Sequence, residues 1–253
     1  MLFNTAARMC ADSSVPTTYE GEGVVGIAFG EDVLDVPRNV YKNGLIIDLT
    51  AAEILKEQGV DVGLVEVIPE RSKGGALMEN RFEHFLPEDE YTNDSYDAYE
   101  ITVAEGAEID SELEYKNELT TQTTPAAYFY ENADGEKFFV FAHRAYFNGE
   151  GSYRSYARAR QLRRAVERLS GKRLPAFVDG NPDVYLITKR AEDGSLAVAL
   201  FNLSIDTLLD GVVELDATYS RVRADGAEAT LEGDKVKLST VQPFSFVSLH
   251  LEK

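Results

Sequence analysis

A glycine-rich segment near the start of the chain has the spacing of a dinucleotide-binding loop. Residues Gly21 to Gly26 read GEGVVG, which fits G-x-G-x-x-G. In such a site a strand precedes the glycines and a helix follows them, so that the N-terminus of the helix holds the pyrophosphate. Here Pro16 interrupts the preceding residues, no clear helical pattern follows, and Glu22 would place a negative charge beside the phosphates. We therefore predict no nucleotide cofactor.

The single cysteine and the three histidines are the candidates for a nucleophile and its base. A glutamine-amidotransferase-like site needs its cysteine on a tight strand-to-helix turn. Cys10 lies instead in ARMCADS, within a helical pattern, which predicts a packed thiol. His84, His143 and His250 are scattered and lack the spacing of zinc ligands. We expect His143 to end a strand, His250 to lie on the surface, and no metal site.

Carboxylates are plentiful, but their spacing selects no catalytic pair. The segment Pro87 to Asp97, PEDEYTNDSYD, has neither the regular oxygen offsets nor the glycine of a calcium loop, which favours a solvated acidic loop. Glycosidases need two carboxylates about 5 to 10 Å apart on either side of the sugar. Because the chain has 44 acidic residues, some pair will meet that distance by chance. The sequence assigns no catalytic residue, and an independent carboxylate-dependent glycosidase stays open as an alternative.

Composition limits the classes of partner. The 253 residues carry a formal net charge of -19, which would repel nucleic acid and anionic membranes. One cysteine allows no internal disulfide. The first residues have Arg8 inside their apolar stretch and lack the core of a signal peptide, and no apolar run approaches the roughly 20 residues of a membrane span. We expect a soluble, cytoplasmic protein that binds neither nucleic acid nor membrane.

The first part of the chain is expected to form an open α/β layer. Gly44 to Gly59 reads GLIIDLTAAEILKEQG, a short buried strand followed by a helix. Thr50 is predicted to cap a helix over Ala51 to Gln58, and the following glycine to end it. A second strand over Val62 to Pro69 then predicts a crossover between parallel strands. This layer would be amidotransferase-like or flavodoxin-like.

Hairpin patterns appear later in the chain. Ala126 to Ala142 has two aromatic-rich runs around Asp134-Gly135, which predicts antiparallel strands. After Pro175 the helical pattern disappears, and Asp183 to Ser204 reads strand, turn at Asp193-Gly194, strand. Further short strands follow at turn-punctuated spacing, which is typical of a small antiparallel β-sandwich. We predict two domains, an α/β domain over residues 1–172 and a sandwich over 173–253.

A basic helix separates these two parts. Ser152 to Ser170 has a helical apolar pattern with a glycine at its end. From Gly151 to Pro175 the chain carries eight basic residues and one acidic residue, a net charge of +7, so the remainder carries -26. Arg160, Arg163 and Arg164 are therefore candidates for contact with an acidic surface of this chain or of another subunit in a homo-oligomer. A solvated basic face is the alternative.

Two segments together resemble a known family. Gly44 to Gly59 resembles G-L-L-L-D-x-x-A-A-x-x-L-x-x-x-G, and Ser170 to Leu215 is similar to the segment that follows it, in the C-terminal, non-catalytic part of large bacterial glycoside hydrolases of the β-galactosidase type. In that family a (β/α)8 barrel is followed by an amidotransferase-like α/β domain and a β-sandwich. The chain has no eightfold strand-helix alternation for the barrel, so no catalytic residue of the family is carried over. Asp48 is expected only to shape the corner before the helix.

These observations predict a non-catalytic accessory or oligomerisation region of a carbohydrate-active enzyme. Its expected partner is a catalytic barrel of the same protein or of another subunit. The alternative is a free-standing carbohydrate-binding or structural module. Because the chain has no tryptophan, Tyr128, Tyr130 and Tyr146 are the candidate rings for sugar contact. The resemblance implies no cofactor.

Overall fold

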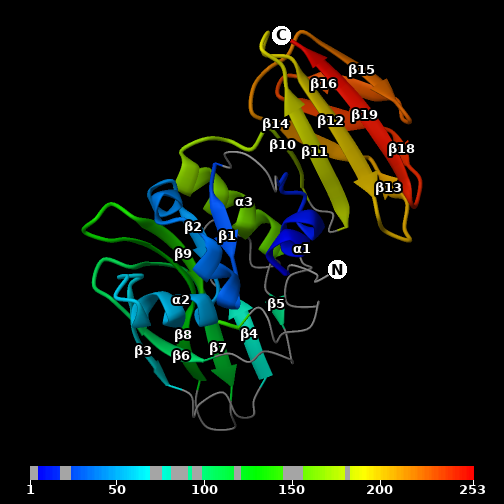
Figure 1. The fold of residues 1–253 in the computed structure, drawn as a ribbon. Coiled ribbons are helices and arrows are strands. Elements are labelled where there is room, and N and C mark those ends of the chain that lie inside the picture. Colours follow the sequence, from blue (N-terminus) through cyan, green and yellow to red (C-terminus); the bar gives the residue numbers. More distant parts are fainter. Residues whose placement is uncertain are drawn as a thin grey trace. The chain divides into compact units, whose positions relative to one another are not determined.

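The computed structural model describes residues 5–17, 24–68, 76–80, 91–92, 99–116, 121–144, 156–179 and 183–253. Side chains are described in these ranges except at 76–80, 91–92, 115–116 and 121–122. The chain divides into two compact units, drawn as ribbons in Figure 1. The first unit contains the described residues 5–6, those between 24 and 144, and 168–170, and the second contains 7–17, 156–167, 171–179 and 183–253.

A mixed sheet forms the centre of the first unit. Its elements are β1 (Gly26–Ala28), η1 (Gly30–Asp35), η2 (Arg38–Lys42), β2 (Leu45–Ile47), α2 (Leu49–Glu57), β3 (Leu64–Ile68), β4 (Ala76–Asn80), β5 (Tyr91–Thr92), β6 (Glu100–Val103), β7 (Glu108–Lys116), β8 (Thr121–Glu131) and β9 (Lys137–Phe141). Seven strands pair in the order β1-β2-β9-β8-β7-β4-β5. β1, β2 and β9 are parallel, and the remaining pairs are antiparallel.

The strand after α2 does not join this sheet. β3 pairs antiparallel with β6 in a separate two-stranded sheet, so the predicted parallel crossover into residues 62–69 is wrong. A central parallel strand is buried on both faces, whereas Val65 and Glu66 of β3 are exposed. The parallel neighbours of β2 are β1 and β9, and β9 belongs to the predicted hairpin with β8. The hairpin prediction is confirmed.

One apolar cluster joins α2 to the sheet. Leu45 and Ile47 of β2 are buried together with Leu49 and Leu55 of α2 and Phe138 of β9. Burying each of these side chains contributes about 2 kcal/mol to folding. The helix predicted after this strand therefore packs against the sheet, and the α/β character of the first unit is confirmed.

The second unit contains two helices and two larger antiparallel sheets. Its elements are α1 (Thr5–Asp12), α3 (Tyr156–Ser170), β10 (Ala176–Val178), β11 (Val184–Arg190), β12 (Leu196–Asn202), β13 (Leu208–Leu209), β14 (Val212–Leu215), β15 (Arg221–Asp225), β16 (Ala229–Glu232), β17 (Lys235–Leu238), β18 (Thr240–Val241) and β19 (Ser245–Glu252). The first two residues of α1 and the last three of α3 group with the first unit. The larger sheets have the orders β10-β14-β17-β16 and β11-β12-β19-β15, and β13 pairs with β18.

The two larger sheets share one core and therefore form a β-sandwich. Val178 and Val236 of one sheet are buried in the same cluster as Leu186, Val198 and Val247 of the other. Buried residues alternate with more exposed ones along β12, as in a strand with one face toward a core. The predicted sandwich is confirmed.

The basic helix α3 ends where its sequence predicts. Leu162, Ala165 and Leu169 are buried along one side of it. Gly171 follows with φ +66, the left-handed conformation in which a helix commonly stops. No helix within the described ranges combines the length and the apolar character needed to cross a membrane.

Candidate functional site

The glycine-rich segment lacks the context of a dinucleotide site. Its described part begins at Val24, and Gly26 opens strand β1 rather than a helix. A Cβ atom at Gly26 would lie 2.8 Å from side-chain atoms of both Val40 and Leu45. The glycine therefore allows close packing. A pyrophosphate needs a helix N-terminus at this point, and none follows Gly26.

Cys10 is a packed thiol, as predicted. It is buried in α1, and burial raises the pKa of the thiol to about 12. The thiol is therefore protonated near neutral pH, whereas a catalytic cysteine must form a thiolate.

The described histidines also lie where the sequence predicts. His143 follows β9, is buried, and its ring centroid lies 5.2 Å from that of Phe141. His250 is exposed on β19. Across the residues described with side chains, no three His, Cys, Asp or Glu groups come together as a metal site. His84 and most of the acidic segment 87–97 lie outside the described residues.

Asp48 organises the corner between β2 and α2. The side chain is completely buried, and its Oδ1 accepts hydrogen bonds from the backbone N–H of Ala51 at 2.9 Å and of Gly30 at 2.8 Å. Asp48 thus caps α2 and holds the start of η1 beside it. The predicted cap, Thr50, is wrong by two residues, because Thr50 lies inside the first turn and its hydroxyl accepts from Arg144 Nη1 at 3.4 Å. The expectation that Asp48 shapes this corner is confirmed.

A second carboxylate, Glu136, is enclosed by the β8–β9 hairpin. Arg38 donates to both of its oxygens, from Nε at 2.6 Å and from Nη2 at 3.1 Å. Asn132 Nδ2 donates to Oε2 at 2.9 Å. The hydrogen bonds from Arg38 outweigh burial and, with the bond from Asn132, hold the pKa of Glu136 below its usual value. Glu136 is therefore an ionised structural acceptor.

The tyrosines named as sugar contacts belong to the same hairpin. Tyr128 is fully buried, and its hydroxyl donates to the carbonyl of Val62 at 3.1 Å. The hydroxyl of Tyr130 donates to Asp61 Oδ2 at 2.7 Å. Tyr128 therefore has no ring face available for a sugar, while Tyr130 is half-buried and anchored. Tyr146 lies outside the described residues.

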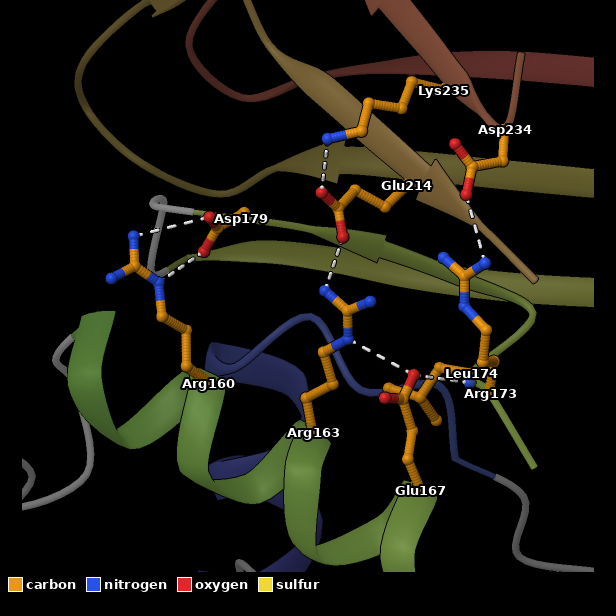
Figure 2. A network of polar contacts seen from close by, with 9 residues as sticks. All are labelled: Arg160, Arg163, Glu167, Arg173, Leu174, Asp179, Glu214, Asp234 and Lys235. Atoms are coloured by element: carbon orange, nitrogen blue, oxygen red, sulfur yellow. Dashed lines mark hydrogen bonds and ion pairs between the residues drawn. The ribbon is translucent and has the colours of Figure 1, made fainter. Parts of the chain in front are cut away.

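A network of charged side chains joins α3 to the sandwich sheet, as Figure 2 shows. Arg163 points from α3 toward β14, where its Nη1 donates to Glu214 Oε2 at 2.6 Å. Its Nε donates to Glu167 on the same helix at 3.2 Å. The guanidinium also lies over the ring of Phe177, 4.7 Å from the centroid. From the opposite side, Lys235 Nζ donates to Glu214 Oε1 at 2.9 Å.

Glu214 is held ionised between these two cations. Burial alone would raise its pKa, but the hydrogen bonds from Lys235 and Arg163 outweigh burial and keep the pKa below its usual value. Glu167 extends the network, because its Oε1 also accepts from the backbone N–H of Leu174 at 2.9 Å. A general acid needs a raised pKa, so Glu214 has the wrong electrostatics for that role.

Two further arginines contact carboxylates of the second unit. Arg160 donates to Asp179 at 2.8 and 3.4 Å, and Arg173 donates to Asp234 at 3.0 Å. Arg164 is half-buried in α3. The carboxylates that contact Arg160 and Arg163 belong to this chain. An acidic surface of the same chain was one of the two partners predicted for the basic helix. Contact with another subunit stays a prediction.

Sequence reasoning did not identify the partner carboxylates. Glu214 lies in the strand pattern VVEL, where alternation indicates a position facing away from the core. That pattern could have marked it as a partner for the helix, but it does not select Glu214 from the other strand carboxylates.

Comparisons with known proteins give a fold but no family. No family model matches the chain, and no curated protein matches it. Among solved structures, α-L-fucosidase isoenzyme 2 from Paenibacillus thiaminolyticus matches with a TM-score of 0.62 and 13% sequence identity. The match covers 98% of this chain and 44% of that one, so the chain spans less than half the length of that enzyme. At this identity the likeness shows the fold alone.

Proposed function

We propose that the chain is a non-catalytic accessory region of a carbohydrate-active enzyme, with an amidotransferase-like α/β unit followed by a β-sandwich. The observation that carries the proposal is the use of the enclosed carboxylates. Asp48 caps a helix, while Glu136 and Glu214 are ion-paired with a lowered pKa. Burial raises the pKa of Glu53, but this carboxylate is ion-paired with Arg144 at 2.8 Å. A glycosidase needs a carboxyl group with a raised pKa that is free to protonate the leaving oxygen.

Two similarities support the proposed accessory role. Gly44 to Gly59 and Ser170 to Leu215 resemble the non-catalytic part of β-galactosidase-type glycoside hydrolases. The fold matches under half of an α-L-fucosidase chain, which leaves room in such a protein for a separate catalytic domain. The partner in this proposal is a catalytic barrel of the same protein or of another subunit, in a cytoplasmic bacterial enzyme. The role is to frame or oligomerise that barrel.

An assay of hydrolysis tests the absence of catalysis. The purified chain is incubated with nitrophenyl α-L-fucoside, nitrophenyl β-D-galactoside and related aryl glycosides. We expect nitrophenol release at the rate of the buffer blank. Turnover that disappears on one Asp or Glu substitution would overturn the proposal in favour of an independent glycosidase. Cys10→Ala serves as the companion variant, because ammonia release from glutamine that depends on Cys10 would instead indicate an amidotransferase.

Sequencing of the coding DNA on both sides tests the accessory role. We expect a (β/α)8 barrel to be encoded in the same reading frame or in an adjacent one. A gene with neither would support the free-standing module.

A further inference from the structure

Three aromatic side chains form a row across the sheet β11-β12-β19-β15. Tyr185 on β11 is directly opposite Phe201 on β12, and Phe201 is directly opposite Phe246 on β19. Adjacent ring centroids lie 6.0 and 5.8 Å apart, with interplanar angles of 33° and 30°. We call Tyr185, Phe201 and Phe246 the aromatic row. Each pair of adjacent rings is tilted, at a centroid distance at which aromatic side chains interact.

The aromatic row lies on the outer face of the sandwich. Its flanking residues, such as Leu186, Leu200 and Val247, are buried in the shared core, and side chains alternate between faces along a strand. Phe246 is 56% exposed, while the other two rings are half-buried. The core therefore does not account for the row.

A strained residue precedes the last member of the row in the chain. Phe244, two residues before Phe246, is 73% exposed and has φ +53. A bulky side chain adopts this left-handed conformation only against a steric penalty, and such strain concentrates at functional sites. The turn is held by Ser245, whose hydroxyl donates to the carbonyl of Gln242 at 2.7 Å. The chain thus maintains a strained turn that exposes a further aromatic ring.

Polar side chains border the row on the same face. Two residues after Phe246 on β19, Ser248 is opposite Ala199 on one side and Asp225 on the other. Two residues further along β19, His250 is opposite Arg223. The surface therefore combines aromatic rings with a hydroxyl, a carboxylate, an imidazole and a guanidinium that is ion-paired with a carboxylate of β19 at 2.8 Å.

We infer that this face binds a neutral saccharide. The electron-rich face of an aromatic ring attracts the polarised C–H bonds of a pyranose, and the neighbouring groups can bond its hydroxyls. The net charge of -19 disfavours an anionic ligand. The inference deepens the proposed function, on which it rests, by giving the accessory region a ligand.

Calorimetric titration of the full chain tests this site. The probes are neutral oligosaccharides, namely cellohexaose, xylohexaose, mannohexaose, galactotriose and a fucosylated lactose. We expect at least one to bind, and Phe246→Ala to raise its Kd about tenfold. Phe246→Leu should weaken binding similarly because it keeps an apolar side chain but loses the ring, and Phe246→Tyr should retain binding.

Tyr156→Ala provides the matched control. Tyr156 is 51% exposed at the start of α3, so this variant removes a similarly exposed ring from another element and should leave Kd unchanged. The thermal midpoint of each variant shows that it is folded. Absence of binding to every probe, or binding that survives both Phe246→Ala and Phe246→Leu, would overturn the inference.

Two further readouts separate the alternatives. If light scattering shows a dimer that Phe246→Ala dissociates and no probe binds, the row is an interface between copies and the inference is wrong. The titrated samples are also analysed for shortened oligosaccharides. Cleavage would contradict the non-catalytic role while leaving binding measurable, whereas intact probes without binding would contradict the saccharide site alone.

Discussion

In the first unit the carboxylate of Asp48 is completely buried and accepts hydrogen bonds from the backbone N–H groups of Ala51 and Gly30. In the second unit, by contrast, Glu214 keeps 19% of its side chain exposed and is bound by two cations. Both side chains hold elements together. Water can partly replace the partners of Glu214, but it cannot reach the donors that Asp48 satisfies. The difference predicts that similar substitutions have unequal effects in the two units.

The largest effect is expected at Asp48. Asp48→Ala should lower the free energy of unfolding by about 3 kcal/mol, because α2 loses its cap and two N–H donors lose a buried acceptor. Urea denaturation followed by far-ultraviolet circular dichroism measures this. Asp48→Asn keeps an acceptor oxygen and should lose distinctly less. An alanine variant as stable as Arg160→Ala would show that the two units do not differ in this respect.

A smaller effect is expected when the charge of the basic helix is reversed. Changing Arg160, Arg163 and Arg164 together to Glu should lower the free energy of unfolding by about 2 kcal/mol at low salt, more than the sum of the single changes. The reversed side chains would face Asp179 and Glu214, and added salt should narrow the gap to wild type by screening. A triple variant that melts like wild type at low salt, with unchanged mass, would show that α3 is merely solvated.

Acid should destabilise both units through their ion-paired carboxylates. Glu136 and Glu214 have a lowered pKa in the folded chain, so their contribution is complete above the ordinary glutamate value of 4.5 and is lost as pH falls through the folded pKa. The urea midpoint, measured from about pH 6 down to pH 3, should therefore decrease. Glu136→Gln and Glu214→Gln should each flatten the curve. If neither variant changes the slope, these pairs do not set the acid sensitivity.

The smallest effect is expected at the most exposed pair of the network. Arg160→Ala should cost less than about 1 kcal/mol, because Arg160 and Asp179 are both more than one third exposed. Arg163→Ala is the matched variant on the same helix and should cost more, since Arg163 binds two carboxylates and stacks on Phe177. The thermal midpoints of the two variants, measured at one salt concentration, give their order of stability. Equal midpoints would contradict the graded network.

Elements that depend on neighbouring residues could be predicted from the sequence. The turns at Asp134-Gly135 and Asp193-Gly194 lie between paired strands as predicted, and Gly171 follows the end of α3. These signals are local, because glycine adopts the positive φ that such turns and helix ends need without the steric cost of a side chain. Even the error at Thr50 was only two residues, since Asp48 and Thr50 both have side chains suited to capping.

Only the tertiary structure decided which distant residues meet. β3 pairs with β6 outside the main sheet, where Val65 and Glu66 are exposed. No local pattern in the sequence specifies β6 as its partner. Arg163 and Glu214 are 51 residues apart, and their contact depends on how α3 packs against β14. The aromatic row likewise needs the register of three strands. Alternation along one strand assigns a side chain to a face, but the neighbour across the sheet is set by the pairing of whole strands, whose stability is a property of the complete core.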